Sequence, residues 1–187
     1  MEADPCAEPS WYGVKCNNGE VVRLHLEMNN LAGFVPSQVG LLVELTRNLK
    51  LDRNSLIGTL PTQLGNLVKL STNMNFYSNK MDGPIPSELG MINKLQLNFA
   101  LYVNSFSGEL PTEVGQLTEM TNGFSLVKNS LTGTFPTELG QLTGLIESFR
   151  FFSNLITGTL PSKSLCSHAP YSLFAVAPEP HFCHHTV

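Results

Sequence analysis

The chain has 187 residues, of which 42% are hydrophobic and only 14% are charged, and its net charge at neutral pH is −4. This slight excess of acid gives no electrostatic reason to expect nucleic acid or an anionic membrane as a partner. No apolar run approaches the roughly 18 residues of a membrane span, and no apolar signal region precedes the first cysteine, so a targeting segment would be absent from this chain.

A period of 25 residues dominates the sequence. The string "NSFSGELPTEVGQLT" at 104–118 returns as "NSLTGTFPTELGQLT" at 129–143. A fixed period of this size is typical of repeat architectures. We therefore expect an N-terminal cap at 1–20, six repeats at 21–161, and an irregular C-terminal cap or tail at 162–187. One column of the repeat is always asparagine: Asn29, Asn54, Asn79, Asn104, Asn129 and Asn154.

Each repeat begins with a predicted short strand. Apolar residues stand five and three positions before each column asparagine, and this spacing of two is typical of a strand with one buried face. The first of these columns contains Leu24, Leu49, Met74, Phe99, Phe124 and Phe149. The asparagine follows where the strand ends, and its amide can both donate to and accept from a buried backbone bend. We interpret this column as a structural ladder rather than as a binding site.

A turn and a short helical segment complete the predicted unit. A Gly-x-x-Pro turn reverses the chain, and a hydroxyl residue follows the proline. We expect this hydroxyl to cap a short helical turn by accepting a bond from a free backbone N–H. The hydroxyl column contains Ser37, Thr62, Ser87, Thr112, Thr137 and Ser162. One such unit cannot bury its apolar face alone, whereas a stack of six can.

The pattern LxLxxNxLxGxxPxxLG resembles the plant-type extracellular leucine-rich repeat over residues 21–161, as in receptor-like kinase ectodomains and polygalacturonase-inhibiting proteins. The unit is one residue longer than the common plant unit, with the extra residue just before the strand. In this respect it is similar to repeats of algal (diatom-type) proteins. The resemblance implies an α/β solenoid: a right-handed superhelix with a parallel concave β-sheet and short helical turns on its convex side.

The cysteines fall outside the repeats. Cys6 and the segment Trp11 to Cys16 resemble the N-terminal cap of that family, which implies a Cys6–Cys16 disulfide. A second disulfide, Cys166–Cys183, would suit a C-terminal cap and an extracellular or cell-surface location. The alternative is a metal site formed with nearby histidines, but the spacing matches no zinc pattern, so we expect neither metal nor cofactor. These histidines are His168, His181, His184 and His185.

The sequence contains no recognisable catalytic set. Glu88, Glu113 and Glu138 recur at the repeat spacing, so all three have the same environment, whereas a glycosidase needs two acids with different pKa values. No Ser-His-Asp or Cys-His arrangement and no phosphate loop is present. We therefore predict that the chain is not an enzyme.

The predicted ligand-binding surface is the concave face of the sheet, where the repeats differ from one another. Along one of its columns the residues change from acidic to aromatic, and exposed aromatic residues are favoured at binding interfaces. Aromatic packing that merely stabilises the sheet is an equally good interpretation. The candidate ligand-binding residues are His25, Glu27, Lys50, Asp52, Asn75, Tyr77, Tyr102, Val127, Arg150 and Phe152.

These residues suggest a non-catalytic recognition module for a peptide, protein or carbohydrate, in a receptor-like, inhibitor-like or adhesion role. The alternative is a structural or ice-binding surface protein, which would use the hydroxyl column instead. That column is already explained by the predicted helix capping, and about half of it is serine.

Overall fold

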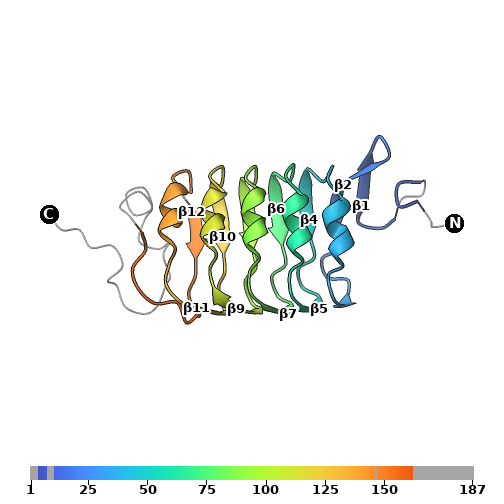
Figure 1. Cartoon of the computed structure of the whole chain (residues 1–187). Helices are drawn as coiled ribbons and strands as arrows, with labels where there is room; N and C mark the ends of the chain where they lie inside the picture. The colour runs from blue at the N-terminus through green and yellow to red at the C-terminus, as the bar shows by residue number, and fades with distance from the viewer. Residues whose placement is uncertain (1–3, 8–10, 146, 162–187) are drawn as a thin grey trace.

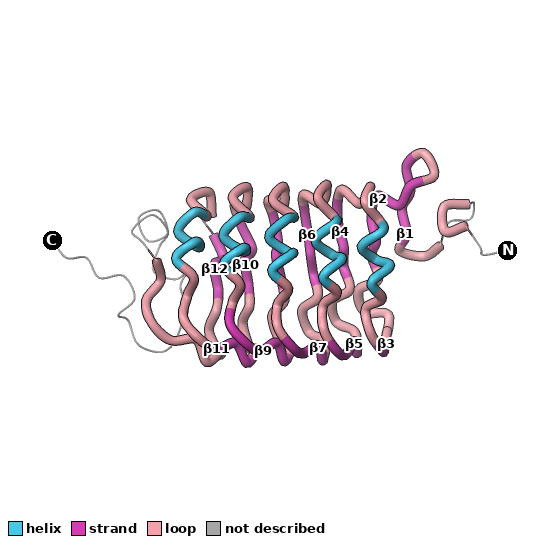
Figure 2. Tube along the Cα trace, viewed as in Figure 1, coloured by secondary structure: helices cyan, strands magenta, loops and turns pink. Residues whose placement is uncertain are grey.

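A computed structural model describes residues 4–7, 11–145 and 147–161. The described residues form a row of stacked coils, with the N-terminal cap at one end and the sixth repeat at the other (Figure 1). Each coil contributes one strand to a long sheet on one side and, in the first five coils, one short helix on the other side (Figure 2).

The concave sheet has seven strands in the order β1-β2-β4-β6-β8-β10-β12. β1 and β2 form an antiparallel hairpin in the cap, and the remaining pairs are parallel. Neighbouring strands are in register by one repeat, so that Leu49 pairs with Met74 and Met74 with Phe99. The strands are β1 Val14–Asn17, β2 Glu20–His25, β4 Arg47–Lys50, β6 Thr72–Asn75, β8 Leu97–Ala100, β10 Asn122–Ser125 and β12 Glu147–Arg150.

A second parallel sheet occupies the part of the repeat where the sequence predicted only a turn. It has five strands in the order β11-β9-β7-β5-β3 and runs along the lower edge of the stack in Figure 2. Its strands are β3 Ala32–Gly33, β5 Ser55–Gly58, β7 Lys80–Gly83, β9 Ser105–Glu109 and β11 Ser130–Thr132. The second residue of β5, β7, β9 and β11 is buried in the core, as Met81 and Phe106 are, and this burial holds the second sheet in place.

The helical turns are 3₁₀ helices, and the predicted capping by hydroxyls is wrong. They are η1 Ser37–Leu41, η2 Thr62–Asn66, η3 Ser87–Met91, η4 Thr112–Gln116 and η5 Thr137–Gln141. The N-cap position is held by the preceding proline, and no side chain caps the helix. The hydroxyl residue is therefore the first helical residue, and its oxygen contacts the next side chain instead, as Thr112 Oγ1 does with Glu113 Oε2 at 3.2 Å. Ser162 lies outside the described residues.

Glycine in each helix sets the packing distance between coils. A Cβ atom at Gly65 would stand 2.4 Å from the backbone oxygen of Glu88 in the next helix, and Gly90 and Gly115 meet the following helices in the same way. Only glycine permits this approach of two backbones. The Leu-Gly or Val-Gly pair of each helix thus joins an apolar residue that packs in the core to a contact between helices.

The core lies between the two sheets and the helices. Leucine columns fill its N-terminal half, and phenylalanine rings increasingly replace them toward the C-terminal end. The rings of Phe99 and Phe124 on adjacent coils stack with centroids 5.0 Å apart, and the rings of Phe124 and Phe151, also on adjacent coils, are 5.5 Å apart. Such rings interlock across coils, so each coil is buried by its neighbours rather than by itself.

The column asparagines hold the bends at the strand ends through backbone groups. The Oδ1 atom of Asn79 accepts from Leu56 N–H, while its Nδ2 donates to the carbonyls of Leu51 and Phe76. Asn54, Asn104, Asn129 and Asn154 make the same kinds of contact. Asn29, which begins the column, is exposed, and its amide nitrogen donates to no described residue other than Glu27, at the backbone carbonyl.

The N-terminal cap is closed by a disulfide between Cys6 and Cys16, the pair that the family resemblance implied. Gly13 in this cap has a φ of +76°, and a Cβ atom there would stand 2.0 Å from the His25 carbonyl oxygen. The predicted Cys166–Cys183 bond, the neighbouring histidines and the C-terminal cap at 162–187 lie outside the described residues.

The described residues contain neither a membrane-spanning helix nor a cluster of metal-ligating side chains. None of the helices in residues 4–7, 11–145 and 147–161 is long and apolar enough to cross a membrane. Within the same residues, no three His, Cys, Asp or Glu side chains come together as a metal site would require.

Candidate functional site

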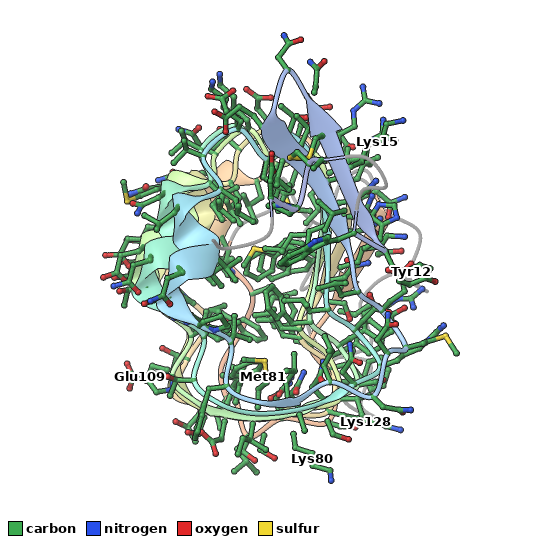
Figure 3. All side chains as sticks on the ribbon, turned by 90° about the vertical axis from the view of Figure 1, so that its right-hand side faces the viewer. Tyr12, Lys15, Lys80, Met81, Glu109 and Lys128 are labelled. Atoms are coloured by element: carbon green, nitrogen blue, oxygen red, sulfur yellow. A yellow bond between two sulfur atoms is a disulfide. The ribbon has the colours of Figure 1, made fainter. Side chains whose placement is uncertain are left out.

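The concave sheet forms one side of the molecule when it is viewed along the stack. In Figure 3, Tyr12, Lys15 and Lys128 lie on this side, while Glu109 lies toward the helices and Met81 points into the core. Each candidate residue is either the last residue of a strand, as His25, Lys50 and Arg150 are, or the second residue after a strand end, as Tyr77 and Tyr102 are. Side chains at these two positions lie on the opposite side of the chain from the core residue between them.

Two stacked tyrosines occupy the centre of this face. The Tyr77 and Tyr102 rings are parallel within 8°, with centroids 4.3 Å apart, because they hold the same position in adjacent repeats. The Arg53 guanidinium lies 5.4 Å from the Tyr77 ring centroid. Burial and the interaction of its hydroxyl with the Asp52 carboxylate raise the pKa of Tyr77 well above its ordinary value. Burial likewise raises the pKa of Tyr102. Both phenols therefore remain neutral at physiological pH.

The N-terminal half of the face is polar and more enclosed than the sequence predicted. Lys50 Nζ lies 3.8 Å from Glu27 Oε1. Asp52 is only 3% exposed and Asn75 only 8%. Strands about 4.8 Å apart let long side chains shield short ones, which explains why these candidates are buried. Buried oxygens of Glu27, Asp52 and Asn75 and the Nε2 atom of His25 find no hydrogen-bond partner among the described residues.

The C-terminal half of the face contains a hollow of about 450 Å³. It is lined by the small residues Ala100, Gly123 and Ser125 and by the aromatic residues Tyr102 and Phe152. Val127 also lines the hollow but is only 7% exposed, so it contributes shape rather than a protruding contact. Arg150 is exposed at one side of the hollow.

The structure adds three residues that the sequence prediction missed: Arg53, Val103 and Lys128. They follow the last candidate column directly and have positive φ values of 53° to 56°. This left-handed conformation brings the residue to the rim of the concave sheet, so that Val103 and Lys128 also line the hollow. The sequence signal was present, because this column also varies between repeats: Met28, Arg53, Ser78, Val103, Lys128 and Ser153.

The side chains of the concave face are suited to binding a ligand through non-covalent contacts. Aromatic faces, amides, hydroxyls and cations are spread over several strands, as for an extended ligand that contacts several repeats. The described residues bring together no nucleophile and base in the manner of a hydrolase site, and the acidic column on the helices stays half-buried and uniform.

No protein-family model matches this sequence, and no curated protein sequence matches it either. Solved structures do. The PEPR1–AtPEP1 complex matches 94% of this chain with 28% identity and a TM-score of 0.79, and the match covers 23% of that chain. The BIR3–SERK2 complex from Arabidopsis thaliana matches 82% of this chain with 30% identity and a TM-score of 0.68, and the match covers 80% of that chain.

Two further similar structures are described by what those proteins bind. The plant peptide hormone receptor RGFR1 in complex with RGF2 matches 81% of this chain with 31% identity and a TM-score of 0.71. This chain spans only 27% of that receptor chain. A plant ice-binding protein matches 85% of this chain with 25% identity and a TM-score of 0.68, and the match covers 51% of that protein.

Proposed function

The chain belongs to the leucine-rich repeat proteins of the plant type, and from this premise we propose that it is a non-catalytic recognition module that binds an extended peptide on its concave sheet. The observation that carries the proposal is the Tyr77–Tyr102 stack at the centre of this sheet. The proposal includes an extracellular or cell-surface location, which the Cys6–Cys16 disulfide supports.

The tyrosine pair is suited to be an anchor because it is already ordered. Each ring is held by the other, and the Asp52 carboxylate interacts with the Tyr77 hydroxyl. A rigid aromatic surface loses little conformational entropy when a ligand binds. Aromatic side chains are also enriched among the residues that contribute most to binding free energy. Tyr77 and Tyr102 are therefore the centre of the proposed site, with Phe152 extending it and Arg150 orienting the ligand.

A peptide hormone receptor among the similar structures supports the choice of a peptide ligand within this proposal, and the BIR3–SERK2 complex keeps a protein ligand as the alternative. Among the similar structures, RGFR1 is a peptide hormone receptor in complex with RGF2. Because this chain spans about a quarter of that receptor chain, the receptor, inhibitor and adhesion roles are parts of the proposal rather than findings. We likewise propose the division of the chain into a cap at 1–20 and six repeats at 21–161, and its likeness to algal 25-residue repeats.

The test uses a random peptide library displayed on phage and selected on the immobilised chain. Peptides that are enriched are synthesised, and their dissociation constants are measured for the parent chain and for Tyr77→Ala and Tyr102→Ala. Truncation of an aromatic anchor is expected to weaken binding by roughly thirtyfold, which corresponds to about 2 kcal/mol. Glu113→Ala on the helical side is the matched control and should leave binding unchanged.

Two results would contradict the proposal. One is that folded Tyr77→Ala and Tyr102→Ala variants bind every selected peptide as tightly as the parent chain does. The other is that Glu113→Ala is the variant that loses binding, which would place recognition on the helical side. Circular dichroism of each variant shows whether the fold is retained.

Ice binding is the second candidate, because the hydroxyls of the helical column prove to be free of capping and the residues that carry them are exposed. The similarity to a plant ice-binding protein also favours it. However, the neighbouring carboxylates of Glu88, Glu113 and Glu138 accept from these hydroxyls, which does not suit a flat array of threonines. Thermal hysteresis of the chain that is lost in the Thr62→Val, Thr112→Val double variant would support ice binding. Absence of hysteresis would exclude it.

A further inference from the structure

A second asparagine ladder runs along the concave sheet, and it stops beside the hollow. The second residue of each strand from β4 to β12 is in the left-handed region, and these residues are Asn48, Asn73, Asn98, Gly123 and Ser148. The Asn73 side-chain amide donates to Asn48 Oδ1 at 2.5 Å, and the Asn98 amide donates to Asn73 Oδ1 at 2.6 Å. At Gly123 there is no side chain to supply the next donor.

The gap at Gly123 leaves one acceptor free. The Asn98 Oδ1 atom stands 2.3 Å from the point where a Cβ atom on residue 123 would be, so it faces the vacant place in the ladder. No described residue donates a hydrogen bond to this oxygen. Asn98 and Gly123 both line the hollow, which means that the free amide oxygen lies where a bound molecule can contact it.

The charges around the hollow have one sign. Lys128 and Arg150 line it, and no described acidic side chain does. Neither cation forms an ion pair with a described residue, whereas Lys50 and Lys69 each pair with a glutamate. In a chain with a net charge of −4, two unpaired cations at one hollow favour an anionic ligand group.

We propose that this hollow is the subsite for an acidic side chain of an extended peptide, and that Gly123 keeps it open by interrupting the ladder. The carboxylate lies between Arg150 and Lys128 and accepts their charge-assisted hydrogen bonds. A backbone N–H of the same peptide donates to Asn98 Oδ1 in place of the missing rung. The inference rests on the proposed peptide-binding function and names the chemistry of its ligand.

The experiment uses three blocked pentapeptides, acetyl-Ala-Ala-Xaa-Ala-Ala-amide, with Glu, Gln or Lys in the centre. Five extended residues span about 16 Å, or about three strand spacings. Binding is measured by nuclear magnetic resonance titration of the isotope-labelled chain. The Glu peptide should bind about fivefold more tightly than the Gln peptide and shift the Arg150 side-chain signal, because a charge-assisted bond replaces a neutral one. The Lys peptide should bind more weakly than either.

Two variants of the hollow test the Arg150 cation and the gap at Gly123 separately. Arg150→Gln should remove the preference for Glu over Gln. Gly123→Asn should weaken both peptides at least tenfold, because asparagine tolerates the left-handed region while its side chain would displace Asn98 Oδ1 and fill the gap in the ladder. Ser125→Leu, at an ordinary strand position, fills the same hollow and replaces Gly123→Asn if that variant does not fold. Lys94→Gln, an exposed residue of the turn after η3, is the matched control for charge and should change nothing.

Equal binding of the Glu and Gln peptides, or an unchanged preference in Arg150→Gln, would overturn the subsite. If signals near Tyr77 and Tyr102 still shift in that case, peptide recognition on the concave sheet stands while the subsite fails. If none of the three peptides shifts any signal of the hollow, the subsite is also wrong, and the phage selection decides separately whether peptides bind at all.

Discussion

Replacing Asn104 by alanine should destabilise the whole stack far more than the loss of one surface amide would suggest. The Asn104 side chain serves three backbone groups at once: Oδ1 accepts from Met81 N–H at 3.0 Å, and Nδ2 donates to the carbonyls of Phe76 at 3.0 Å and Leu101 at 3.1 Å. All three partner residues are fully buried. Alanine would leave each of these backbone groups without its partner.

The expected loss in the free energy of unfolding is about 3 kcal/mol, taking about 1 kcal/mol for each of three hydrogen bonds. Asn29→Ala is the matched control, because Asn29 is exposed and its side chain donates to no described residue other than Glu27. Its expected loss is below about 1 kcal/mol. Asn104→Asp keeps the acceptor but removes both donors and brings a carboxylate toward two carbonyls. It should therefore be at least as destabilising as Asn104→Ala.

Urea unfolding followed by circular dichroism measures these losses. Fluorescence of Trp11, the single tryptophan, reports on the cap at the same time. The two signals must coincide for a two-state free energy to be valid, since repeat stacks can unfold in parts. Equal losses for Asn104→Ala and Asn29→Ala would refute the ladder argument, as would an Asn104→Asp variant as stable as the parent chain.

Two further predictions concern residues of the concave face. Val103 has a φ of +56°, which is unfavourable for a β-branched residue. Val103→Asn should therefore raise the free energy of unfolding, measured in urea, by about 1 kcal/mol. If Val103→Asn instead loses as much stability as Val127→Asn does at a buried position, the argument is wrong. The raised pKa of Tyr77 means that its stabilising contribution is complete below the ordinary tyrosine pKa of about 10 and is lost as the pH rises from there toward the folded-state pKa. The urea concentration at the unfolding midpoint should therefore decrease as the pH is raised above about 10, and this decrease should be smaller in Tyr77→Phe. The same decrease in both proteins would show that Tyr77 is not responsible.

The solenoid and its concave columns could be predicted from sequence because the repeat averages out local ambiguity. A single "LNFALYVN" segment could be a strand or a buried helix turn, but the same spacing of apolar residues in six units specifies a stacked strand. The Tyr77–Tyr102 contact followed directly, since residues 25 apart become neighbours on adjacent strands. The column asparagines were predictable for the same reason.

The second sheet, the proline N-caps and the second ladder were not predicted from the sequence, because they depend on backbone dihedral angles and on which side chains the neighbouring coils bury. The second sheet arises because residues such as Met81 and Phe106 are buried in a segment that resembles a turn. The capping prediction failed because proline, rather than the hydroxyl residue, occupies the N-cap position. The column of rim residues does vary between repeats, but the positive φ values at Arg53, Val103 and Lys128, like those of the second ladder, are not visible in the sequence.

The two ladders tie the chain to the length of its own unit. Their bonds join residues 23, 25 or 28 positions apart, as in Met81 to Asn104, Asn98 to Asn73 and Asn104 to Phe76. A one-residue insertion between two rungs would break both ladders at that point, whereas duplication of a whole unit would leave every bond intact. The molecule can therefore lengthen only in whole steps, each adding one strand and about 4.8 Å of concave surface. An engineer could insert a complete repeat before Asn122, which would separate the Gly123 and Arg150 side of the hollow from its Tyr102 side by that one step while leaving the core contacts within each repeat unchanged.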